Sequence, residues 1–158
     1  MPDINFQITA LREEAFLHFF QQSDAELSAA GIRRMIADTK PGFPCRVSLQ
    51  DAEIGEEVIL LAYQHHAPES PYRSSGPIFV RKNASTARPA VNEIPAMLIH
   101  RLLSLRAYDS NGMMVNADVV EGKNLNGTIH KFFMDPSVDY IHIHNAKPGC
   151  YNCCVRRA

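Results

Sequence analysis

The chain has 158 residues, of which 46% are hydrophobic and 21% charged, as is typical of one globular domain that buries a core without disulfide bonds. Sixteen Lys and Arg residues against seventeen Asp and Glu residues leave a formal net charge of -1, which argues against a nucleic-acid partner. Charged residues interrupt the first twenty positions and no stretch reaches the length of a membrane span, so we expect a cytoplasmic protein with no membrane partner.

Two helices are predicted near the N-terminus. The first follows Thr9 and has apolar residues at four-residue steps, which is the spacing of one face of an amphipathic helix. These residues are Leu11, Ala15 and Phe19. Ser23 and Glu26 match the pattern of a capping box, so a second helix should begin after Ser23 and end near Gly31.

Four strands and two long loops are predicted in the middle of the chain. The strands cover residues 32–40, 45–50, 58–63 and 77–81. The apolar run at 58–63 lacks strict alternation, which is typical of a central strand covered on both faces. Residues 65–76 and 82–95 contain several Pro and Ser residues and exceed the usual length of a connection, so they are candidates for a binding surface.

A hairpin, two helices and a final strand complete the predicted elements. The hairpin covers residues 104–120, and its Asn111-Gly112 dipeptide favours a type I′ turn. The helices are expected near residues 96–102 and 124–134, and the strand over 138–145. This succession predicts an α+β fold in a single domain over residues 1–158, with a largely antiparallel sheet, two N-terminal helices and one or two further helices.

The last of these strands carries two histidines on one face. Side chains alternate along a strand, so Ile141 and Ile143 point to one side while His142 and His144 point to the other. With the isoleucines in the core, the two histidines lie about 7 Å apart at Cα, a spacing from which both imidazoles can reach one ion. His142 and His144 are therefore candidate ligands of zinc or iron.

Cys150 and Cys153 are two further candidate ligands. Their CxxC spacing suits zinc or iron, and with the two histidines they complete a tetrahedral set if the chain turns between them. If residues 149–157 instead form a strand that pairs with residues 140–145, the two thiols diverge, and the sequence favours this hairpin. A thioredoxin-like redox pair is not expected, because no helix of useful length follows Cys153.

Basic side chains suggest a second kind of site. Arg46, Arg73, Arg81 and Arg106 lie in or next to predicted strands or the loop at 65–76, and a guanidinium group binds carboxylates and phosphates with paired hydrogen bonds. Arg46, Tyr72, Arg73 and Arg81 are the candidate ligand-binding residues. The alternative is that the arginines form structural ion pairs with the acidic residues at 51–57.

Four stretches of the sequence resemble one bacterial protein family. They are PGFPCRVSL at 41–49, YRSSGPIFVR at 72–81, LSLRAYDSNGMMVNADVV at 103–120 and YIHIHNAKPGCYNCCVRR at 140–157. Together they resemble the family called domain of unknown function 1203, over almost the whole chain. The resemblance implies a small bacterial protein of one domain, and it implies no substrate, cofactor or catalytic residue.

Two classes of function are compatible with these features. The first, which the sequence favours, is a non-catalytic module that binds a small anion or a partner protein through the long loops. The alternative is a metal-binding protein or metalloenzyme built on the four histidine and cysteine candidates, with Arg73 or Arg81 orienting an anionic substrate. A homodimer is compatible with either class, but no sequence feature requires it.

Overall fold

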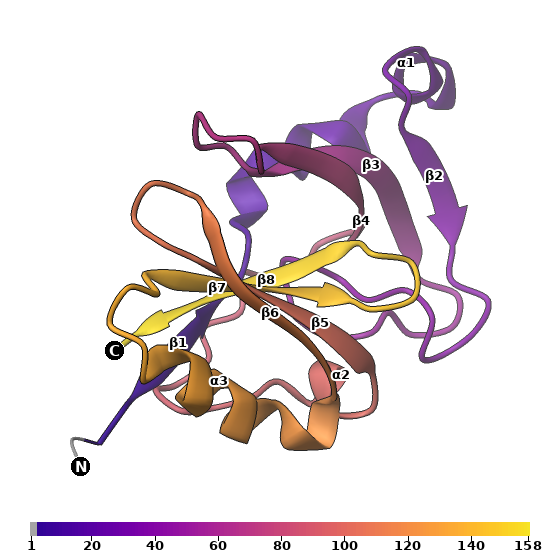
Figure 1. The fold of residues 1–158 in the computed structure, drawn as a ribbon. Coiled ribbons are helices and arrows are strands. Elements are labelled where there is room, and N and C mark those ends of the chain that lie inside the picture. The colour runs from indigo at the N-terminus through magenta and orange to yellow at the C-terminus, as the bar shows by residue number, and fades with distance from the viewer. Residues whose placement is uncertain (1–2) are drawn as a thin grey trace.

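The computed structural model describes residues 3–158, whose strands form two sheets (Figure 1). The five-stranded sheet has the order β1-β8-β7-β5-β6, and the three-stranded sheet has the order β2-β3-β4. The first contains β1 (Phe6–Thr9), β8 (Tyr151–Arg157), β7 (Tyr140–Asn145), β5 (Leu102–Tyr108) and β6 (Met114–Glu121). The second contains β2 (Arg33–Ile36), β3 (Glu57–His66) and β4 (Ser74–Arg81). All of these strand pairs are antiparallel.

The helices of the described chain are short. The α-helices are α1 (Asp24–Ala29), α2 (Ala96–Ile99) and α3 (Leu125–Phe133). The 3₁₀ turns are η1 (Glu13–Ala15), η2 (Leu17–Gln21) and η3 (Gly122–Asn124). Over residues 3–158, no helix combines the length and the apolar character needed to cross a membrane.

The structure confirms the α+β class and the antiparallel pairing, and it corrects the N-terminal helices. The first expected helix is replaced by η1 and η2, because Phe16 between them adopts a φ of -121° and breaks the helical path. The second is α1, a single short helix with the predicted capping box. Ser23 accepts a hydrogen bond from the Glu26 amide, and the Glu26 side chain accepts one from the Ser23 amide.

Residues 45–50, predicted as a strand, form a turn instead. Leu49 adopts a positive φ of 51°, which ends the extended conformation, and isolated bridges join Pro44 to Asp51 and Cys45 to Phe79. Val47 packs in the core of the three-stranded sheet, whereas Leu49 packs in the core of the five-stranded sheet. The turn therefore anchors the two sheets to each other, and the strands divide into two sheets rather than one.

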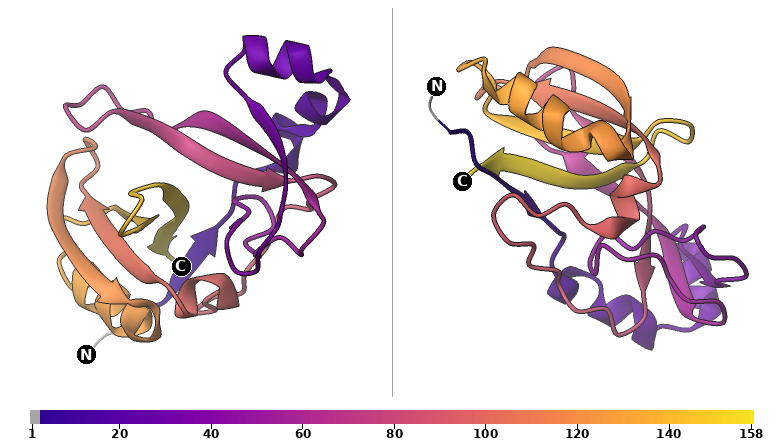
Figure 2. Two further views of the ribbon diagram at one scale, coloured as in Figure 1. Left: turned by 90° about the vertical axis from the view of Figure 1, so that its right-hand side faces the viewer. Right: turned by 90° about the horizontal axis from the view of Figure 1, so that it is seen from below.

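Each sheet has its own apolar core. Ile141 and Ile143 of β7 pack with Ile129 and Phe132 of α3, which lies along one face of the five-stranded sheet (Figure 2). The three-stranded sheet packs against the N-terminal turns and α1 through a separate set of apolar residues. The C-terminal end of β3 lies over the face of the five-stranded sheet that is turned away from α3, because the rings of His65 and His144 meet there at 4.9 Å between centroids.

The predicted hairpin is confirmed as β5 and β6, although its turn differs from the expected type. Tyr108 pairs with Met114, so residues 109–113 form the turn. Of the Asn111-Gly112 pair, only Gly112 has a positive φ, at 75°. The Asp109 side chain accepts hydrogen bonds from the amides of Asn111 and Met113 and holds this longer loop, which a two-residue type I′ turn does not describe.

We expect Gly122→Ala to destabilise the protein strongly. A Cβ at this position would meet the backbone carbonyl groups of Leu98 and Ile99 in α2, and backbone atoms cannot yield as a flexible side chain can. The expected loss is about 3 kcal/mol of the free energy of unfolding, the upper end for overpacking. The control is Gly127→Ala in α3, where a Cβ meets no atom within 4 Å. This substitution is expected to raise the free energy of unfolding by at most about 1 kcal/mol, because alanine favours a helix more than glycine does. Urea unfolding measures both, and equal midpoints for Gly122→Ala and the wild type would contradict the expectation.

Candidate metal centre

The two histidines of β7 share the face of the sheet that is turned away from α3, as the alternation predicts. Ile141 and Ile143 lie in the apolar core, while His142 and His144 are outside it and are 5% and 0% exposed. Both side chains therefore lie beneath the C-terminal end of β3.

A third histidine reaches the same place from the other sheet. Between Tyr63 and His66, strand β3 carries a bulge in its pairing with β4, so the strict alternation of side chains is lost. The ring of His65 lies 4.9 Å from that of His144 and 6.2 Å from that of His142. One ring nitrogen from each of these three histidines lies within 4.8 Å of the other two. We call His65, His142 and His144 the three-histidine cluster.

His144 is held in one tautomer by the turn that follows β7. Its Nδ1 lies 2.9 Å from the carbonyl oxygen of Gly149, and because a carbonyl only accepts, Nδ1 carries the proton and donates. The lone pair is therefore on Nε2, which is buried and has no hydrogen-bond partner among the described residues. A backbone carbonyl that orients an imidazole in this way is a common second partner of metal-binding histidines.

The other two histidines also contain nitrogens without a partner. The Nδ1 atoms of His65 and His142 are buried and form no hydrogen bond to any described residue. Buried polar atoms are almost always satisfied, so three such nitrogens in one cluster require an explanation. A bound metal ion is one that uses their lone pairs.

All three imidazoles are held in the neutral form at pH 7. Burial is the main cause, and it lowers the pKa of His142 to about 2, that of His144 to about 3 and that of His65 to about 4. The nearby Arg106 lowers the last two further, whereas the Gly149 carbonyl acts in the opposite direction on His144. Neutral imidazole is the form that binds metal ions, because the lone pair is free.

Aromatic rings enclose the cluster. The Tyr151 ring of β8 stacks on His65 with 5.3 Å between centroids and lies 5.0 Å from His142 and 5.7 Å from His144. Burial raises the pKa of Tyr151 well above its ordinary value, so its phenol is neutral. These contacts surround the histidines with apolar ring surface, which strengthens electrostatic interactions at the site.

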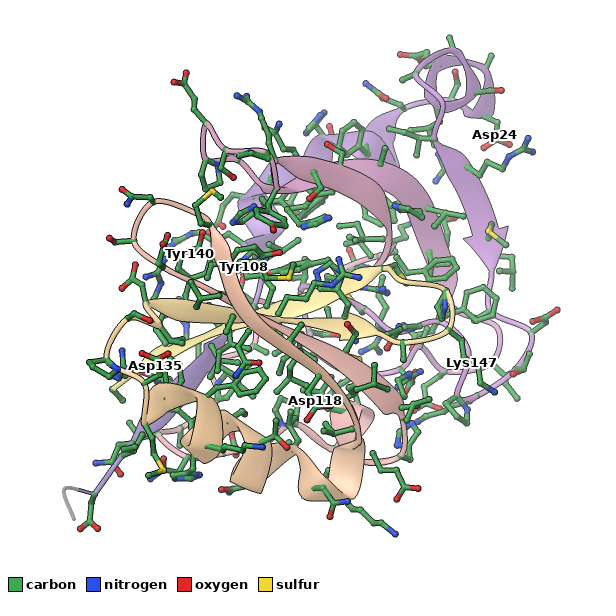
Figure 3. The ribbon with its side chains drawn as sticks, in the orientation of Figure 1. Asp24, Tyr108, Asp118, Asp135, Tyr140 and Lys147 are labelled. Carbon is green, nitrogen blue, oxygen red and sulfur yellow. The ribbon has the colours of Figure 1, made fainter. Side chains whose placement is uncertain are left out.

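His66, next to His65, belongs to a separate hydrogen-bonded group. Its Nδ1 donates to the Tyr72 carbonyl at 2.9 Å, so its Nε2 accepts from the Tyr140 hydroxyl at 2.6 Å. Tyr108, the last residue of β5, and Tyr140, the first residue of β7, stack with 5.3 Å between ring centroids, and both are labelled in Figure 3. With both nitrogens engaged, His66 supports the wall of the site and offers no free ligand atom.

The structure does not bring the two cysteine candidates to the histidines. Residues 151–157 form β8, which pairs with β7 in the hairpin that the sequence favoured. Cys153 lies opposite Ile143 and is fully buried in the core on the α3 side of the sheet. The Cys150 sulfur lies 3.2 Å from Nη2 of Arg46 instead. The CxxC segment is extended, so its two thiols diverge and do not chelate one ion with His142 and His144.

The four ligand-binding candidates are also dispersed. Arg46 is fully buried, and besides Cys150 its guanidinium donates to the carbonyls of Pro44 and Tyr151, which fixes the β8 end beside the three-histidine cluster. Arg81 donates to Glu56, Ser48 and Gln50, as expected of a structural ion pair. Tyr72 and Arg73 are exposed in the turn between β3 and β4. These side chains do not form one site.

The fold and the site together define a class: an α+β protein in which two antiparallel sheets meet over a buried cluster of three neutral histidines. The chain belongs to the family described as protein of unknown function (DUF1203), whose model matches residues 42–157. All three histidines and Arg106 lie within the matched residues. Comparison with curated proteins and with solved structures found no match.

Proposed function

We propose that this protein binds a divalent transition metal ion through His65, His142 and His144. The supporting observation is the convergence of one ring nitrogen from each residue to within 4.8 Å, in a buried setting where these imidazoles are neutral. This ligand set differs from the alternative of two histidines and two cysteines considered from the sequence, because only the two histidines of that alternative lie at the site.

Zinc is the ion we expect, with iron(II) as the second choice. Imidazole nitrogen suits zinc, iron, copper and nickel, and three histidines without a thiolate are the ligand set of open zinc sites. Such a site keeps a fourth position for water or for another ligand, whereas structural zinc sites usually have four protein ligands. His65 is half-buried, so the site is closer to solvent on the β3 side than on the β7 side.

Equilibrium zinc binding tests the proposal. Chelator-treated wild-type protein without a histidine tag is expected to bind about one equivalent of zinc, measured by titration calorimetry and by elemental analysis after dialysis. His65→Gln and His144→Gln are each expected to weaken binding by more than about 100-fold, because loss even of an outer partner costs 10- to 100-fold.

The matched control for these variants is His130→Gln. His130 lies on α3, on the other side of the five-stranded sheet, and its Nδ1 is paired with the Asn126 carbonyl of the same helix. This variant is expected to bind zinc like the wild type. No zinc uptake by folded wild-type protein, or equal affinity in the His65→Gln variant, would show that the histidines are only packed side chains.

A further inference from the structure

The charge of the site has no anionic compensation from its ligands. Three neutral imidazoles leave the full charge of a divalent ion in place, and no Asp, Glu or Cys joins the group of potential ligands in residues 3–158. An uncompensated ion in a partly buried site is costly, because the loss of hydration is not repaid. A site of this composition therefore favours an anion as the fourth ligand of the ion.

Arg106 adds a further positive charge beside the cluster. It lies on β5 directly opposite His142 of β7, on the same face of the sheet, because its neighbours Leu105 and Ala107 point into the core. Side chains directly opposite each other in an antiparallel pair have Cβ atoms about 5 Å apart. The positive charge of Arg106 also lowers the pKa of His65 and of His144, as expected of a guanidinium close to both rings.

The charge of Arg106 is not neutralised by a carboxylate. Within residues 3–158 it forms no ion pair, and its Nε lies 3.4 Å from the Ser104 hydroxyl. The charges of two other arginines also lower the pKa values of these histidines, but both guanidinium groups already have partners. Arg46 is fully buried and bonded to carbonyls and a thiol, and Arg156 pairs with Asp139 at 3.6 Å. Arg106 is the half-buried arginine at the site that has a charge to offer.

We propose that Arg106 and the metal ion together bind a small carboxylate. One carboxylate oxygen takes the open position on the ion, and the guanidinium donates to the other oxygen, which suits the planar fork of arginine. This inference rests on the proposed function, since the carboxylate is a ligand of the metal ion. The anion binding expected from the sequence at Arg46, Tyr72, Arg73 and Arg81 is thereby assigned to a different arginine.

Acetate binding to zinc-loaded protein is the test. The wild type is expected to bind acetate in titration calorimetry when zinc is present and not when zinc has been removed. Arg106→Gln is expected to keep one equivalent of zinc and to bind acetate about 10- to 100-fold more weakly, as follows from losing a hydrogen bond between charged groups. Arg73→Gln, which removes an exposed arginine in the β3–β4 turn, is expected to match the wild type in both measurements.

The outcomes separate the two proposals. Zinc uptake by Arg106→Gln together with unchanged acetate affinity would overturn the role of Arg106 and leave the metal site intact. Acetate binding of equal strength with and without zinc would overturn the role of the ion as a partner of the anion. Absence of zinc uptake by the wild type would instead remove the proposed function. If Arg106→Gln does not fold, as judged by circular dichroism, Arg106→Lys replaces it, and retention of full acetate affinity there would contradict the need for the planar fork.

Discussion

His142 and His144 together are expected to lower the free energy of unfolding of the metal-free protein by about 4 kcal/mol when the pH falls from 7.5 to 5. In the folded state their pKa values are about 2 and about 3, far below the ordinary value of 6.5. At these two histidines, the unfolded chain therefore takes up two more protons below pH 6.5 than the folded chain does. Stability is full above pH 6.5 and decreases as the pH falls, by about 1.4 kcal/mol per pH unit for each histidine.

Urea unfolding in the presence of a chelator, at pH 7.5, 6 and 5, measures this loss. His65 contributes in the same direction, since burial also lowers its pKa, while Glu56 contributes only at more acidic pH because the hydrogen bond from Arg81 lowers its pKa. His142→Gln removes one of these protons, so its loss over the same interval should be about 2 kcal/mol smaller than that of the wild type. The lowered pKa values would be wrong if wild type and variant lost the same free energy of unfolding. They would also be wrong if the His142 and His144 ring signals titrated near pH 6.5 in NMR spectra.

The elements that local patterns determine were predictable from the sequence. The capping box of Ser23 and Glu26, the apolar run of β3 and the alternation of β7 all depend on neighbours within a few residues, and all three are present in the structure. The turn at 45–50 was not predictable in the same way. Val47 and Leu49 alternate as in a strand, but they pack into two different cores, and that arrangement depends on contacts with distant residues.

Two of the three histidines in the candidate site were visible in the sequence. His142 and His144 share a face because alternation in a strand is local. His65 was assigned to a loop, although the His65-His66 doublet directly follows the apolar run of β3. Alternation lets only one of two neighbouring residues face the partner sheet, and the bulge removes this limit. The bulge arises because Gln64 and His65 together face a single residue of β4. This mismatch depends on how β3 and β4 pair, so the sequence of β3 alone does not predict it.

The cysteines show the converse error of a local pattern. CxxC spacing suits a metal ion only when the backbone turns between the thiols, and this segment is extended because Tyr151 and Cys153 pair with β7, whereas β1 pairs only with residues 154–157 of β8. A turn at Cys150 to Cys153 would break this pairing with β7, including the hydrogen bond that the Asn145 amide donates to the Cys150 carbonyl at 2.9 Å. Long-range pairing thus decides which of two locally acceptable geometries is present.

Zinc is expected to stabilise the protein by joining the two sheets. Its ligands come from β3 of the three-stranded sheet and β7 of the five-stranded sheet, so only the folded chain presents them together. At a free zinc concentration of about 100 times Kd, the free energy of unfolding should rise by about 2.7 kcal/mol, reduced by any zinc bound to cysteines and histidines of the unfolded chain. The measurement is urea unfolding at pH 7.5 with and without zinc.

Comparison between variants with the same cysteines isolates the site. His65→Gln should lose the zinc-dependent gain, because the ion then keeps ligands from one sheet only, whereas His130→Gln should retain it. An equal gain in His65→Gln and wild type would place the ion elsewhere in the folded chain. Cys150→Ser would then be the next variant to examine, since the Cys150 thiol is half-buried and lies beside Arg46, while Cys153 is enclosed in the core. If the zinc-dependent gain in stability is lost in His65→Gln and retained in Cys150→Ser, the ion is held between β3 and β7.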